Sequence, residues 1–134
     1  AYNVLQAALM LGDIEVIMTS TSETYGSAQK VPIDELHPLV AQSPYAATKI
    51  ASDQMALSYY KSFELPVKIM RPFNIYGPRQ SARAFIPSFI SQALSGSDII
   101  KVGNIFPTRD YTFVRDTADA AIEILNSKSL FGDV

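Results

Sequence analysis

A tyrosine and a lysine four residues apart are the pair in this sequence best suited to chemistry. The segment Tyr45-Ala-Ala-Thr-Lys49 falls in a stretch whose pattern predicts a helix. Residues four apart share one helix face, so the ammonium group of Lys49 can lie near the phenol of Tyr45 and favour its ionised form. A tyrosine tuned in this way can transfer a proton near neutral pH.

A threonine upstream extends this pair. Thr21 follows the short β-branched run 14–18, which predicts a buried strand. Ligands of open α/β sheets bind at the C-terminal ends of the strands. The Thr21 hydroxyl can therefore bond the same substrate oxygen as Tyr45 while hydride leaves the adjoining carbon. Taken alone, a Tyr-Lys pair is also common on exposed helix surfaces, so the surrounding sequence has to decide.

The elements that must position these residues alternate along the chain. Ser43-Pro44 is typical of a helix N-cap followed by proline at the first helical position, and Asp116 is expected to cap the last helix. The connection over 26–43 is expected to be irregular. The order predicts an α/β fold with a largely parallel sheet, forming a single unit over 1–134. The expected helices are 2–11, 44–63, 85–94 and 117–125, and the expected strands are 14–18, 66–70, 99–102 and 110–114.

The bulk composition excludes several classes of function. The chain of 134 residues is 48% apolar and 18% charged, enough for one sizeable core. A net charge of −2 with scattered basic residues argues against nucleic acid or an anionic membrane as a partner. Without cysteine and with one histidine, a disulfide, a thiolate nucleophile and a metal site are all disfavoured. No apolar run is long enough to cross a bilayer, so we expect a cytoplasmic protein.

Four blocks of sequence surround the candidate residues. They are 19–26 (TSTSETYG), 43–49 (SPYAATK), 71–78 (RPFNIYGP) and 109–116 (RDYTFVRD). In this order and spacing they resemble the nucleotide-sugar epimerase, dehydratase and decarboxylase branch of the extended short-chain dehydrogenases. The resemblance implies part of a Rossmann-like doubly wound parallel sheet plus the beginning of the small substrate lobe. The chain would then be the C-terminal half of the Rossmann-like domain with part of the substrate-binding lobe.

The resemblance also assigns roles. Thr21, Tyr45 and Lys49 match the family's Ser/Thr, Tyr and Lys triad, with Tyr45 as the acid/base. Tyr45 and Lys49 would also contact the cofactor, NAD or NADP, with Lys49 bonding the nicotinamide ribose. Asn74 matches an asparagine beside the sugar diphosphate, and Arg109 matches an arginine that pairs with that diphosphate.

Simpler structural roles compete for some of these residues. Asn74 could merely serve the turn before Gly77. Arg109 could pair on the surface with Asp110 or Asp116. His37 has no partner in the sequence, which favours a structural role.

The residues after Thr21 help to choose among reactions. Glu23 resembles the carboxylate with which 4,6-dehydratases remove the proton at sugar C5, next to the new C4 ketone. Many dehydratases carry Asp at the position of Ser22, whereas the GDP-mannose type resembles Ser-Glu, and Ser22 is then a substrate-binding residue. The expected function is an NAD(P)-dependent nucleotide-sugar 4,6-dehydratase, with a 4-epimerase or a uronic acid decarboxylase as alternatives.

The Gly-rich turn that holds the dinucleotide pyrophosphate in this family does not occur in the sequence. We therefore expect the first nucleotide-binding half to be missing, and this chain alone to be inactive and to bind NAD weakly. A different class of alternative is an inactive remnant that acts only as a folding or association module.

Apolar residues spread around the helix 45–63, and the helix 1–11 is also apolar on more than one side. In the resembling family these two helices form a four-helix bundle across a two-fold axis, which implies a homodimer through helices 1–11 and 45–63. The apolar residues of the longer helix in this argument are Ile50, Met55, Leu57, Tyr59 and Tyr60.

Overall fold

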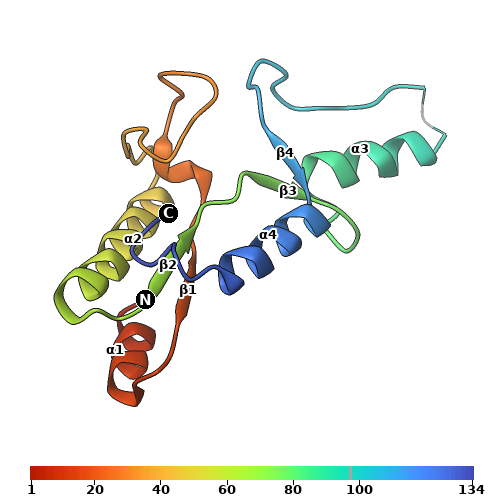
Figure 1. The fold of residues 1–134 in the computed structure, drawn as a ribbon. Coiled ribbons are helices and arrows are strands. Elements are labelled where there is room, and N and C mark those ends of the chain that lie inside the picture. Colours follow the sequence, from red (N-terminus) through yellow and green to blue (C-terminus); the bar gives the residue numbers. More distant parts are fainter. Residues whose placement is uncertain (97) are drawn as a thin grey trace.

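The structure is a computed structural model and describes residues 1–96 and 98–134. Helices and short strands alternate along the chain (Figure 1). In order they are α1 (Tyr2–Leu11), β1 (Val16–Thr19), the 3-10 helix η1 (Ser22–Tyr25), α2 (Pro44–Phe63), β2 (Val67–Met70), β3 (Asn74–Tyr76), α3 (Phe85–Leu94), β4 (Tyr111–Phe113) and α4 (Val114–Asn126).

The described strands pair in parallel. β1 lies beside β2, with Val16 opposite Val67 and Thr19 opposite Met70. β3 lies beside β4, with Asn74 opposite Tyr111. Parallel pairing requires crossover connections, and α2 and α3 lie between the paired strands along the chain. The predicted α/β class with parallel strands is confirmed.

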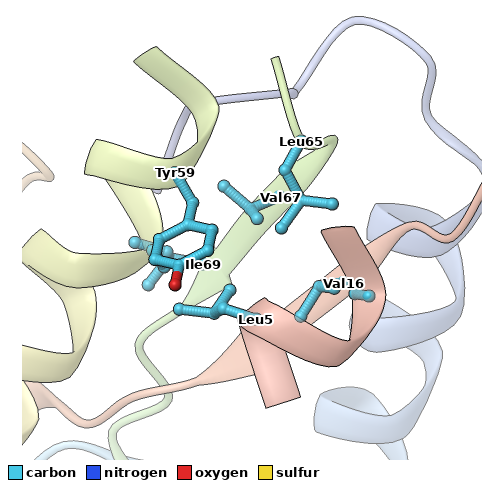
Figure 2. Close-up of a cluster of buried hydrophobic side chains, with 8 residues drawn as sticks. Leu5, Val16, Tyr59, Leu65, Val67 and Ile69 are labelled. Carbon is cyan, nitrogen blue, oxygen red and sulfur yellow. The ribbon is translucent and has the colours of Figure 1, made fainter. Parts of the chain in front are cut away.

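Helices cover both faces of the β1–β2 pair, with α1 and α2 on one side and α4 on the other (Figure 1). The buried core lies between α1, α2 and the two strands, and Figure 2 shows the Tyr59 ring directed into it. The Tyr59 hydroxyl donates a hydrogen bond of 2.9 Å to Gln6 of α1. The core residues are Leu5, Ala8, Val16, Ala56, Tyr59, Leu65, Val67 and Ile69.

The side chain of Lys68 is buried on the opposite face of β2. Lys68 is 1% exposed, and its ammonium donates to Glu15 at 3.2 Å and to the Leu125 carbonyl at 3.1 Å. The same group lies 4.5 Å from the centroid of the Phe131 ring. Lys68 therefore joins β2 to the end of α4 and to the chain beyond it. A buried charge of this kind is tolerated because it is paired and hydrogen-bonded.

The long helix α2 begins and ends as local chemistry dictates. The Ser43 hydroxyl accepts a hydrogen bond from the Ala46 amide at 3.0 Å, and Pro44 follows as the first helical residue. Glu64 ends the helix in the left-handed conformation, with φ of 57°. The predicted cap and both predicted ends of this helix are confirmed.

Two predictions for the second half of the chain were wrong. Residues 99–102 form no strand, because the Gln92 side chain accepts from the Lys101 amide at 2.8 Å and donates to its carbonyl at 3.0 Å. Asp116 does not cap α4, which begins at Val114 directly after β4. Asp116 instead lies in the first turn, where its carboxylate interacts favourably with the helix dipole.

Two smaller expectations from the sequence also differ from the structure. β3 was absent from the expected strands, because its three residues stand in a segment bounded by Pro72 and Gly77. Tyr59 was counted among the apolar residues left for a partner, yet it is buried within this chain and 8% exposed. The described residues include no helix that is both long and apolar enough to cross a membrane.

Candidate active site

A cavity of about 440 Å³ opens at the C-terminal end of β1. Its wall includes Thr21, which follows the strand, Tyr45 from the first turn of α2, and Asn74, the first residue of β3. Tyr45 is 52% exposed, so its ring is accessible to a ligand. The structure thus brings the predicted hydroxyl donor and the predicted acid/base to one cavity.

Lys49 lies at the same edge of the sheet. Its ammonium donates a hydrogen bond of 2.5 Å to the backbone carbonyl of Thr19, the last residue of β1. Thr19 itself lines the cavity. Tyr45 and Lys49 are one turn apart on α2, so a single helix face presents both side chains to the strand end.

Thr21 also shapes the segment that follows it. Its hydroxyl accepts a bond of 3.3 Å from the Glu23 amide, which makes Thr21 the N-cap of η1. Its carbonyl accepts from the Thr24 hydroxyl at 2.8 Å. Ser22 and Glu23 are therefore held in one tight turn directly after the candidate hydroxyl, with Glu23 exposed.

A second cavity, of about 1140 Å³, adjoins the first. Ser22, Glu23, Asn74 and Arg109 lie in its wall. Asn74 lines both cavities, as do Phe73 and Tyr111. All seven predicted site residues except Lys49 therefore line one or both of two adjoining cavities, and Lys49 is bonded to the wall of the first.

The structure also bears on the simpler roles considered for Asn74 and Arg109. Asn74 begins β3, and its amide donates to the Asp110 carbonyl at 3.2 Å, so it belongs to a strand and not to the turn. The Arg109 guanidinium donates to the Thr108 carbonyl at 2.8 Å. Among the described residues, the ion pairs of 4.0 Å or less do not include Arg109 with Asp110 or Asp116.

His37 has the structural role favoured by the sequence. It is 2% exposed, and its Nε2 accepts a hydrogen bond from the Gln29 amide at 3.0 Å. Its Nδ1 lies 2.9 Å from the Pro38 carbonyl, which requires the proton on Nδ1. The ring meets Tyr25 edge-on at 5.6 Å. His37 thus fixes the irregular connection that forms part of the wall of the second cavity.

A buried polar network beneath the first cavity was missed from the sequence. Asp53 of α2 accepts hydrogen bonds from Ser20 at 2.8 Å and from Arg71 at 2.9 Å. Asp53 lies one turn beyond Lys49 on the helix face that already bears Tyr45. An acidic residue continuing that face was the available signal.

The sequence matches the family described as GDP-mannose 4,6 dehydratase over residues 1–131. The chain belongs to this family. The resemblance to NAD-dependent nucleotide-sugar dehydratases and epimerases of the extended short-chain dehydrogenases is thereby confirmed, and with it the Rossmann-like α/β fold.

Individual members of the family and their relatives agree with this assignment. The chain is 39% identical over 112 residues to a dTDP-glucose 4,6-dehydratase of Actinoplanes sp., covering 84% of the chain and 35% of that protein. It is 38% identical to a UDP-N-acetyl-alpha-D-glucosaminuronate decarboxylase of Bacillus cytotoxicus, covering 94% of the chain and 41% of that protein. The crystal structure of dTDP-glucose 4,6-dehydratase from Bacillus anthracis in complex with NAD superimposes with a TM-score of 0.89 at 33% identity, covering 99% of the chain and 43% of that structure.

The chain thus spans less than half the length of each of these three proteins. Its residues fit one end of a nicotinamide cofactor. Tyr45 and Lys49 offer a hydroxyl and an ammonium group at the strand edge, both suited to a ribose. Backbone amides of a Gly-rich turn, which suit the pyrophosphate, are not encoded in this sequence.

Proposed function

We propose that this chain is the catalytic section of a nucleotide-sugar 4,6-dehydratase that acts as part of a longer protein. One observation carries the proposal: Thr21 and Tyr45 line one cavity, and Glu23 lines the adjoining cavity that shares Asn74 with the first. A 4,6-dehydratase needs proton transfer at two neighbouring carbons of one sugar. Two proton-transfer groups in adjoining cavities suit that requirement.

Tyr45 acts as the acid/base at the C4 hydroxyl of the sugar. The Thr21 hydroxyl bonds the same oxygen and fixes it for proton removal. Lys49 supplies a positive charge one turn from Tyr45 on the same helix face. NAD, when bound, would supply the hydride chemistry, taking the hydride from C4 and returning it to C6.

Glu23 takes the proton at C5, which the C4 ketone makes acidic. The C6 hydroxyl then leaves as water and C5 regains a proton, which together use the two protons taken up by Tyr45 and Glu23. With the hydride returned to C6, the net change is the loss of one water. Ser22 stands where many dehydratases carry an aspartic acid, and its hydroxyl binds the substrate. Asn74 and Arg109, both in the wall of the second cavity, bind the diphosphate, for which the guanidinium of Arg109 is the natural partner.

The cofactor contacts of this chain are limited to Tyr45 and Lys49, so the rest of the NAD or NADP site belongs to parts of the protein outside this sequence. The isolated chain should therefore bind NAD(H) weakly or not at all and should be inactive alone. Calorimetric titration of the purified chain with NAD(H) tests this, and micromolar affinity would contradict it. The proposed setting is the cytoplasm, with a homodimer formed through α1 and α2.

The decisive test is a transplant. This chain replaces the matching segment of the Actinoplanes dTDP-glucose 4,6-dehydratase, and the product is analysed with NAD and a nucleotide-sugar. A 4-keto-6-deoxy product, lighter than the substrate by one water, supports the proposal. The Tyr45→Phe variant should lose about 10²–10⁴ in rate, because it keeps the ring and removes the acid/base. An unchanged rate would exclude the proposed role of Tyr45.

A decarboxylase is the second candidate, supported by the 38% identity to the Bacillus cytotoxicus relative. The pair Ser22-Glu23 resembles such enzymes as well. The same transplant distinguishes the candidates when it is supplied with a nucleotide-uronic acid, since release of CO₂ would indicate decarboxylation. Inversion at C4 without loss of water or CO₂ would instead indicate an epimerase.

A further inference from the structure

A buried ion pair lies beneath the candidate active site. The side chain of Asp53 is 1% exposed and that of Arg71 is 5% exposed, and Nε of Arg71 donates to Oδ2 of Asp53 at 2.9 Å. The same carboxylate oxygen accepts from the Ser20 hydroxyl at 2.8 Å. Arg71 Nη1 donates to the Tyr25 hydroxyl at 3.3 Å, and its guanidinium lies 5.1 Å from the Tyr25 ring centroid.

This network joins the two ends of the segment that contains Thr21. Ser20 precedes Thr21 directly, and Tyr25 closes the 3-10 helix that Thr21 caps. The backbone adds two bonds, from the Ser20 amide to the Met70 carbonyl at 2.7 Å and from the Ser22 amide to the Pro72 carbonyl at 3.1 Å. Thr21 therefore lies between Ser20 and Ser22. The amides of these two residues are hydrogen-bonded to the residues on either side of Arg71.

One face of α2 holds the same segment from the other side. Tyr45, Lys49 and Asp53 follow one another at successive turns. Lys49 binds the Thr19 carbonyl and Asp53 binds the Ser20 hydroxyl. The helix that presents the acid/base thus holds the two residues immediately before the hydroxyl donor.

We propose that Asp53 and Arg71 are positioning residues, which act through Ser20 to fix the Thr21 hydroxyl opposite Tyr45. This inference rests on the proposed function, in which Thr21 and Tyr45 bind one substrate oxygen. Neither residue of the pair lines either cavity, so neither touches the substrate.

Charge balance gives the pair a second effect. An unpaired carboxylate at Asp53 would lie one helical turn from Lys49 and would attract its ammonium group. Arg71 neutralises that carboxylate, so the Lys49 ammonium remains bonded to the Thr19 carbonyl at the strand end. Apolar residues of similar volume often replace a buried ion pair without loss of stability. Apolar packing would not supply the fixed directions of the three hydrogen bonds that Asp53 and Arg71 make with each other, with Ser20 and with Tyr25.

The first test requires no catalysis. Scalar couplings and the methyl resonance of Thr21, measured by NMR on this chain, report its side-chain rotamer, which is restricted because the residue is β-branched. The native chain should show one rotamer. Ser20→Ala, which keeps both charges, and Asp53→Asn should each give averaging between rotamers. Asp34→Asn is the matched control, because it breaks the exposed ion pair of 2.6 Å with Lys30. An unchanged Thr21 rotamer in Ser20→Ala and Asp53→Asn would overturn the proposal.

The second test uses the transplanted full-length enzyme. Ser20→Ala should lower kcat by about 10-fold to 100-fold with little change in KM, the scale expected of a small misplacement of a reacting group. In a Thr21→Val background, Ser20→Ala should have no further effect on kcat. A merely structural role would instead lower kcat by the same factor in both backgrounds. If the unsubstituted transplant is inactive, the proposed function fails, while the NMR result still decides the positioning role.

Discussion

The ammonium group of Lys49 donates a hydrogen bond of 2.5 Å to the backbone carbonyl of Thr19. This contact joins the second turn of α2 to the last residue of β1, at the edge where both candidate cavities open. It also fixes the charge one turn from Tyr45. The position of the Lys49 ammonium at the strand end thus follows from a contact between a helix and a strand that are distant in sequence.

Replacing Lys49 by methionine should therefore impair turnover more than folding. In the transplanted enzyme we expect kcat/KM to fall by about 10²-fold or more, because the proposed support of Tyr45 and the proposed ribose contact are both lost. The free energy of unfolding should fall by only about 1 kcal/mol, since the bond to Thr19 is partly exposed to solvent. Steady-state kinetics and urea titration measure the two effects.

Lys61→Met is the matched control, because Lys61 is exposed in the last turn of the same helix. It should leave kcat/KM unchanged. Equal losses in both variants would mean that the helix as a whole, and not the position of Lys49, causes the effect.

Local patterns predicted most of the architecture. The Ser43-Pro44 start of α2, the ends of α1 and α3, and the parallel pairing all follow from caps, periodicity and the alternation of elements. The predictions failed where a specific contact outside the local pattern decided the outcome. Gln92 binds the backbone of Lys101 and so replaces the strand partner that residues 99–102 would have needed. β3 exists only because β4 pairs with it from far along the chain.

In the candidate site, too, local patterns predicted some residues, and residues defined by their contacts were missed. Tyr45 and Lys49 were found from a spacing within one helix, Thr21 from its place after a predicted strand, and the remaining site residues from a resemblance of whole sequence blocks. Asp53 and Arg71 were missed, because their importance lies in contact with each other and with Ser20. The place of Asp53 on the helix face of Tyr45 and Lys49 was a signal, but the sequence does not show which residues a charged side chain on a helix will pair with.

Gly26 is a position where a side chain cannot fit. Its φ of 67° disfavours other residues, and a Cβ would stand 2.5 Å from the Val40 carbonyl oxygen. Gly26→Ala should lower the free energy of unfolding by backbone strain of about 1–3 kcal/mol and by a further steric cost of about 1–3 kcal/mol. Because Gly26 lines the second cavity, substrate affinity should fall as well.

Gly12→Ala separates the two costs. Gly12 has the same φ of 67°, but a Cβ there would meet no atom within 4 Å. It should therefore show the strain alone in chemical denaturation. If both variants lost the same free energy of unfolding, the close approach of Val40 to Gly26 would not contribute to the loss.

Glu15 should make the stability of the fold depend on pH. Hydrogen bonds from Lys128 and then from Lys68 hold the pKa of the Glu15 carboxyl below its ordinary value of 4.5. A carboxyl whose pKa is lower in the folded state contributes stability above the unfolded pKa and loses it as the pH falls through the folded value. Glu15→Gln should therefore lower Tm most at neutral pH, and the difference from the native chain should shrink at pH values below about 4.5.

Glu123→Gln, on the exposed surface of α4, is the control for this measurement. It should leave Tm nearly unchanged at every pH. A loss of Tm in Glu15→Gln that stayed constant from neutral to acid pH would show that the Glu15 charge does not mediate the effect, despite its contact with the buried Lys68.

The proposed homodimer rests on apolar side chains that α1 and the end of α2 leave exposed. Burial of Tyr59 reduces the apolar surface of α2, but Met10 and Leu11 of α1 are 78% and 74% exposed, and Phe63 of α2 is 56% exposed. An apolar surface of this kind is stabilised by a partner of similar character. Light scattering of the native chain at micromolar concentration should therefore give the mass of a dimer or a larger assembly.

Met10→Glu should shift that assembly toward monomer, because the new carboxylate would be desolvated at the interface. The dissociation constant should rise by about 10-fold or more, which corresponds to a cost of about 1.4 kcal/mol. Since Met10 makes little contact within the chain, Tm extrapolated to low protein concentration should not change. Leu94→Glu on α3, where the side chain is 83% exposed, is the matched control and should leave the assembly intact. A native chain that remains monomeric at high micromolar concentration would contradict the proposed interface, and an equal effect of Leu94→Glu would locate the association elsewhere.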